Sequence, residues 1–108
     1  MATAQYSLKL MGGGMQTIST QSTAVVLSTT SKPCQMVTII GVSTNTAPIM
    51  IADSTVKLAT TARVGVPCYW GSTAHPVTVY TTDVQNLYID GVSTEAVSYV
   101  YYGLAVPS

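Results

Sequence analysis

Apolar and polar residues alternate with a period of two along most of this chain, which is the pattern of strands with one buried face. The clearest stretch runs from Asn86 to Leu104 and predicts two strands folded back on each other. In the first of them, Leu87 and Ile89 alternate with polar neighbours. We expect the Asp90-Gly91 pair that follows to supply the positive φ of a tight reversal.

The second strand of this stretch, Ala96 to Tyr102, is β-branched or aromatic at nearly every position. Val97, Tyr99 and Tyr101 alternate with residues that are themselves mostly apolar, which predicts a strand with neither face fully exposed to solvent. Such a strand needs a layer on each side. We expect one layer to be the core of the protein and the other to be a partner.

The same alternation predicts short strands through the rest of the chain, and the most apolar of them, from Cys34 to Val42, is expected in the middle of a sheet. About eight to ten short antiparallel strands at regular spacing predict an all-β fold, a β-sandwich of jelly-roll-like type. The other predicted strands are Ala2–Leu10, Met15–Thr20, Thr23–Ser28, Ile49–Ala52, Thr55–Leu58, Cys68–Trp70 and Val77–Thr81.

Three consecutive glycines, Gly12 to Gly14, divide the chain into two unequal parts. Residues 1–14 are interpreted as an N-terminal arm or first strand that ends in a glycine hinge, and residues 15–108 as a single β-sandwich domain. Two interpretations of the hinge stay open. It is either a flexible loop after a first strand or a pivot that lets the arm lie across a neighbouring molecule.

Charged residues are scarce, and this narrows the classes of function. They make up 7% of the chain, four of each sign, where a soluble domain usually has about a quarter. Tyrosine, threonine and serine supply neutral hydrogen-bonding groups instead, which favours a surface largely in contact with other protein. The four cations are spread along the chain, so we expect neither a nucleic-acid partner nor membrane attachment.

The first residues contain no basic leader, and no apolar run is long enough to span a membrane, so we expect synthesis in the cytoplasm. Cys34 and Cys68 fit no zinc-binding spacing. The favoured interpretation is two free thiols packed as small apolar residues, and the alternative is a bridge between two strands.

Few residues here suit catalysis. His75 is the only histidine and has no carboxylate close to it in the sequence. The acidic residues stand at predicted turns, and a calcium site would require three of them to converge at one end of the sandwich. We therefore expect no enzyme, no metal and no cofactor. The acidic residues are Asp53, Asp83, Asp90 and Glu95.

Two segments, VTIIGVSTNTAPIMIADSTV at Val37–Val56 and VQNLYIDGVSTEAVSYVYYG at Val84–Gly103, resemble small all-β virion proteins of tailed bacteriophages, of the capsid decoration (cement) or head-fibre type. The resemblance covers about 70 residues. The chain departs from the pattern by its N-terminal segment and by lacking a Pro-Gly-x-Ser approach to the last strands. The matching positions are Asn45-Thr46, Ile49–Ser54, Asn86–Gly91 and Val97–Tyr101.

The resemblance implies a non-enzymatic capsid decoration protein on the exterior of the virion. It also implies binding to the major capsid protein and self-association, as a homotrimer at local three-fold positions. For contacts between subunits we expect mainly aromatic residues of the last strand and apolar residues of the N-terminal segment, because aromatic rings give a large contact area at small entropic cost. These residues are Tyr6, Leu8, Leu10, Trp70, Tyr99, Tyr101 and Tyr102.

Two other functions remain open at this stage. A head-fibre or tail-associated binding module would recognise a host-surface glycan through a shallow site made of Tyr69, Trp70 and His75. A small hydrolase, the third hypothesis, would require a cleft that joins His75 to a carboxylate.

Overall fold

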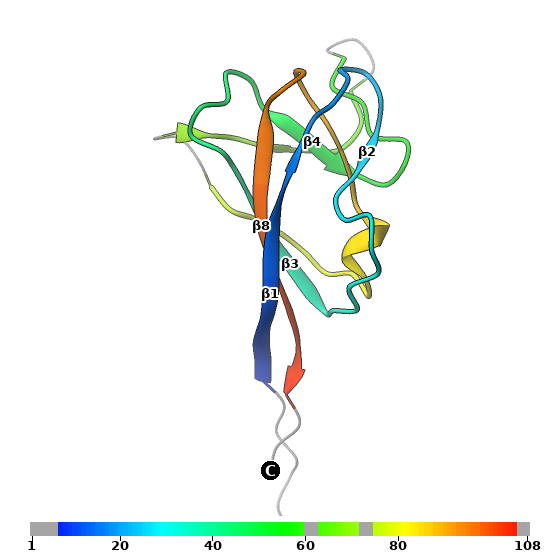
Figure 1. Cartoon of the computed structure of the whole chain (residues 1–108), viewed down its shortest axis with the longest axis vertical. Coiled ribbons are helices and arrows are strands. Elements are labelled where there is room, and N and C mark those ends of the chain that lie inside the picture. The colour runs from blue at the N-terminus through cyan, green and yellow to red at the C-terminus, as the bar shows by residue number, and fades with distance from the viewer. Residues whose placement is uncertain (1–6, 60–62, 72–74, 106–108) are drawn as a thin grey trace, which may run out of the picture.

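The computed structural model describes residues 7–59, 63–71 and 75–105, and these form two four-stranded antiparallel sheets packed as a β-sandwich (Figure 1). The predicted all-β sandwich is confirmed. The described residues contain eight strands and one short 3-10 helix, η2. Their bounds are β1 Ser7–Thr17, β2 Val25–Val26, β3 Met36–Gly41, β4 Ile49–Ala52, β5 Val66–Cys68, β6 Val77–Val79, η2 Val84–Asn86, β7 Tyr88–Asp90 and β8 Ala96–Ala105.

Sheet A has the strand order β1-β8-β3-β6, and sheet B has the order β2-β7-β4-β5. As predicted for the apolar stretch that contains it, β3 lies inside its sheet, between β8 and β6. Every second residue of the inner strands points between the sheets and is almost fully buried, because the side chains of a strand alternate between its two faces. The core includes Val37, Ile39, Ile49, Ile51, Ile89 and Val97.

The prediction that β7 and β8 form a hairpin is wrong. β7 pairs with β2 and β4 in sheet B, whereas β8 pairs with β1 and β3 in sheet A. Their inward residues Ile89 and Val97 fill the same core from opposite sides. The connection also differs from the expectation, because Thr94, with φ 74°, takes the positive φ that was assigned to Gly91.

The glycine triplet does not form the expected hinge. β1 runs through Gly12, Gly13 and Gly14 without a break and pairs with β8 on both sides of a register shift between Leu10 and Gly12. The reason lies in the neighbouring strand. A Cβ on Gly12 would stand 2.8 Å from the hydroxyl oxygen of Tyr101, and a Cβ on Gly14 would stand 2.9 Å from that of Tyr99. The glycines leave room for two tyrosine rings.

Some predicted strands are much shorter in the structure. The predicted strand at Thr23–Ser28 contributes only the two residues of β2, and Thr55–Leu58 belongs to no named strand. Asp53 explains the second case, because its carboxylate accepts a hydrogen bond from the backbone N–H of Thr55 at 2.8 Å and bends the chain. Lys57 then makes a single bridge to Val64.

Candidate functional site

The outward face of sheet B, called the covered face, consists of Val26, Met50, Ala52, Pro67, Tyr88 and Asp90. Met50 and Asp90 alternate with core residues of β4 and β7, so they point away from the core. Each is nevertheless only 1% exposed. Other segments of the chain must therefore lie over this face.

Asp90 shows which segments these are. One carboxylate oxygen accepts a hydrogen bond from the backbone N–H of Ser22 at 2.9 Å, and the other accepts one from the backbone N–H of Leu58, also at 2.9 Å. Val56, two residues before Leu58, is buried as well. A carboxylate that accepts hydrogen bonds from two backbone donors holds both loops against the sheet.

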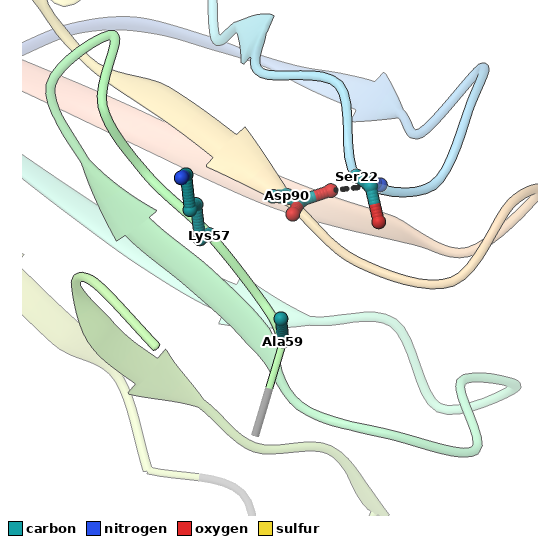
Figure 2. A pocket seen from close by; sticks show the side chains of 4 residues that line it. All are labelled: Ser22, Lys57, Ala59 and Asp90. Carbon is teal, nitrogen blue, oxygen red and sulfur yellow. Dashed lines mark hydrogen bonds between the residues drawn. The ribbon is translucent and has the colours of Figure 1, made fainter. Parts of the chain in front are cut away.

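A pocket of about 290 Å³ opens beside Asp90 and is lined by Ser22, Lys57, Ala59 and Asp90 (Figure 2). Ser22 meets the carboxylate through its backbone N–H, and the Lys57 side chain extends away from the carboxylate. Both oxygens of Asp90 are occupied by backbone donors, so this geometry serves to fix two loops rather than to activate a nucleophile.

The outward face of sheet A, called the bare face, has a different character. Its residues alternate with the core residues of β8 and β3, so they point away from the core, and several large apolar side chains among them are exposed. None of its described side chains is charged. They are Leu8, Leu10 and Met15 of β1, Ser98, Val100, Tyr102 and Leu104 of β8, Met36, Thr38 and Ile40 of β3, and Thr78 of β6.

Five of these side chains, Leu8, Leu10, Met15, Ile40 and Leu104, are between 36% and 65% exposed. Lys9, the charged residue of β1, falls between Leu8 and Leu10 in the alternation and so belongs to the opposite face of the sheet. Leu8, Leu10 and Leu104 lie together at one end of the face, and Met15 and Ile40 flank Ser98 at the other. Exposed apolar side chains on a surface without charge are typical of a place where another molecule can dock.

The residues predicted for subunit contacts are divided between surface and core. Leu8, Leu10 and Tyr102 lie together on the bare face, where Leu10 pairs with Tyr102 across β1 and β8. Tyr99 is 7% exposed and belongs to the core, so it is not a surface contact. Tyr101 packs partly against the same core, and the Lys32 Nζ lies over its ring, 5.9 Å from the ring centroid. The prediction for Tyr6 lies outside the described residues.

Trp70 and Tyr69 follow β5 and form a pair of stacked rings, with their centroids 6.4 Å apart and an interplanar angle of 30°. Tyr69 is exposed and Trp70 is half-buried. His75 is exposed just before β6. The structure thus places two aromatic rings together just after β5.

Glu95 and Asp83 hold together segments that are far apart in the sequence. Glu95 accepts hydrogen bonds from the backbone N–H groups of Thr46 and Ala47 at 2.6 and 3.2 Å. Asp83 caps η2 through the backbone N–H of Gln85 and also accepts from the Ser31 hydroxyl, which lowers the pKa of Asp83. Residues 7–59, 63–71 and 75–105 bring no three histidine, cysteine or acidic side chains together as metal ligands.

Both cysteines are buried free thiols, which confirms the favoured interpretation. Burial raises the pKa of Cys68 to about 11, and burial together with the nearby Asp83 raises the pKa of Cys34. Neither thiol is placed or ionised to act as a nucleophile. Within the described part of the chain, no helix is long and apolar enough to cross a membrane.

Met15, Ile40 and Leu104 also belong to the bare face but were not among the residues predicted for subunit contacts. A signal for Ile40 was present, because alternation with a buried Ile39 places Ile40 on the opposite side of β3. Comparisons with known protein families, with curated proteins and with solved structures find no match to this chain. The bare face is therefore the candidate functional site on physical grounds.

Proposed function

We propose that this protein is a non-enzymatic structural component of a tailed-bacteriophage particle, a decoration protein that docks on the major capsid protein at the capsid exterior. The observation that carries the proposal is the bare face, an uncharged apolar surface on a folded sandwich. The resemblance of two segments to phage virion proteins supports the choice of partner. The scarcity of charged residues is also typical of a surface that is largely covered by other protein.

The mechanism is the burial of apolar area between neighbouring capsid subunits. Five side chains of the bare face are roughly half exposed. Covering each of them contributes about 1 kcal/mol, since full burial of a leucine, isoleucine or methionine contributes about 1.5 to 3 kcal/mol. One copy that touches two subunits adds this free energy to the contact between them and opposes the outward pressure of a packaged genome.

The direct test is uptake of the purified protein by undecorated capsids of the phage that encodes it, measured by co-sedimentation. We expect saturable uptake and a rise in the temperature at which the capsids open. Ile40→Lys, which places a charge on the bare face beside Ser98, should reduce uptake at least tenfold. Val66→Lys is the matched control, because Val66 is a comparably exposed apolar residue on sheet B. Equal uptake of both variants would refute docking through the bare face.

The aromatic pair of Tyr69 and Trp70 favours a second candidate, a head-fibre or tail-associated module that recognises a host-surface glycan. Sugars stack on exposed aromatic rings, and this pair offers two rings side by side. Binding to a glycan array that is lost in Trp70→Ala, without saturable uptake on capsids, would favour this candidate over decoration.

A further inference from the structure

From the edges of the two sheets we infer a surface for self-association. We propose that a second copy of this chain pairs along the free edge of β1, antiparallel and about a two-fold axis, so that two copies of sheet A join into one eight-stranded sheet. This inference does not depend on the proposed capsid partner, because it concerns the protein alone in solution.

The four sheet edges of the sandwich are not equivalent. Three of them are very short, namely the two residues of β2 and the three residues each of β5 and β6, and β5 also contains Pro67. Short strands and proline are devices that stop edge strands from pairing with other chains. β1 has eleven residues and also stands at an edge (Figure 1).

β1 carries two features that hinder pairing with another strand, Lys9 and the register shift between Leu10 and Gly12, and both lie in its first half. The strand contains no proline, and Gly12–Thr17 carries no charge. Near its middle stand Gly12, Gly13 and Gly14, and glycine within a strand is typical of a place where another backbone approaches closely. For Gly13 that backbone is the one of β8, since a Cβ there would stand 2.5 Å from the Tyr99 carbonyl oxygen, and the tyrosine rings of β8 account for Gly12 and Gly14. The case for the outer edge therefore rests on its length and its lack of proline.

The apolar side chains of β1 and the position of Lys9 both favour an antiparallel arrangement. Leu10 and Met15 point to the bare face from either side of the glycines. A two-fold axis near the glycines brings Leu10 of one copy toward Met15 of the other. It also keeps the two Lys9 amines roughly 20 Å apart, which is beyond the distance over which charges interact at physiological salt. A parallel pair in register would place the two lysines side by side.

The size of the contact sets the expected strength of the dimer. Eleven residues in a strand extend about 36 Å, and a sheet is about 10 Å thick, so each copy presents an edge of about 360 Å². Two copies bury about 700 Å² along the edge, and the neighbouring leucine and methionine side chains bring this toward the roughly 1,000 Å² that a specific contact needs. We therefore expect a weak dimer, with a Kd on the order of 10 to 100 µM.

Sedimentation equilibrium of the full chain without capsids, from about 1 µM to about 1 mM, tests this. We expect a monomer–dimer equilibrium in which Met15→Lys raises the Kd at least tenfold. Ile40→Lys is the control, since Ile40 shares the bare face but lies two strands away from the edge. A chain that stays monomeric at about 1 mM, or that forms trimers, overturns the inference, because strands of identical edges pair only in twos.

Hydrogen exchange gives a second readout that needs no variant. Amides of residues 7–17 should exchange several-fold more slowly at about 1 mM than at about 1 µM, while amides of β5 and β6 should not change. A dimer that leaves the exchange of β1 unchanged, or one that Ile40→Lys dissociates as strongly as Met15→Lys does, would show that the faces meet rather than the edges.

Discussion

The outward faces of the two sheets are built by the same alternation of residues, but they differ in how far their side chains are exposed to solvent. Met50, on sheet B, and Ile40, on sheet A, both lie within a strand and next to core residues. Met50 is 1% exposed because loops of the same chain cover it, whereas Ile40 is 36% exposed. The difference teaches that alternation alone does not decide exposure: one outward face is buried within the fold, and the other stays open at the surface.

Truncation of these two residues should give the largest difference. Met50→Ala leaves a cavity under the covering loops and should lower the free energy of unfolding by about 3 kcal/mol. Ile40→Ala removes a side chain that already touches water and should lower it by less than about 1 kcal/mol. Urea denaturation of the two variants measures both values. Equal losses would mean that the two faces are covered alike.

The anchor of the covering loops is the next target. Asp90→Ala leaves the backbone N–H groups of Ser22 and Leu58 without their acceptor, and we expect a loss of about 2 kcal/mol in the free energy of unfolding. Faster hydrogen exchange at these two amides should accompany the loss. Asp53→Ala is the matched control, since that carboxylate accepts from Thr55 in an exposed turn and should matter less. A smaller effect at Asp90 than at Asp53 would contradict the anchoring role.

A change of pH should affect the crossing between the sheets, where Asp83 lies. Asp83, between β6 and β7, has a lowered pKa because the Ser31 hydroxyl and the backbone N–H groups of Gln85 and Lys32 donate to it. Its folded pKa lies below the unfolded value, so its stabilisation is fully present above about pH 5 and is lost as the pH falls through the folded pKa.

Urea midpoints measured from pH 7 down to about pH 3 check this. The wild type should lose stability below about pH 4, and Asp83→Asn should start from a lower midpoint at pH 7 and decline less steeply. Parallel curves for the two proteins would show that other carboxylates set the acid limit.

The alternation of residues was enough to predict the core of the sandwich. Leu87 and Ile89 were expected to share a buried face and are both in the core, because a period of two fixes which side chains share a face. It could not say which sheet a strand joins. β7 and β8 look like a hairpin in the sequence, yet they enter the core from opposite sheets, since a loop of a few residues can either reverse within a sheet or cross between sheets.

For a related reason, neither the conformation of the glycines nor the position of the candidate site could be predicted from neighbouring residues in the sequence. Gly12 and Gly14 are in a strand because rings of Tyr101 and Tyr99, more than eighty positions later in the chain, fill the space beside them. Likewise, nothing near Met50 or Ile40 in the sequence tells which of them a distant loop will cover. The alternation locates outward residues, and only the tertiary fold decides which of those remain open to a partner.

The smallest expected effect is that of salt on binding through the bare face. Its described side chains are all uncharged, so association there should change less than about threefold between 50 and 500 mM NaCl at pH 7. Contacts that depend on charge pairs weaken strongly over this range, whereas apolar burial is little affected or slightly strengthened. Capsid uptake measured across the salt series tests this. A fall of tenfold or more would mean that the partner is held by the scattered charges outside the bare face, and the contrast between the two sheets would then lose its functional meaning.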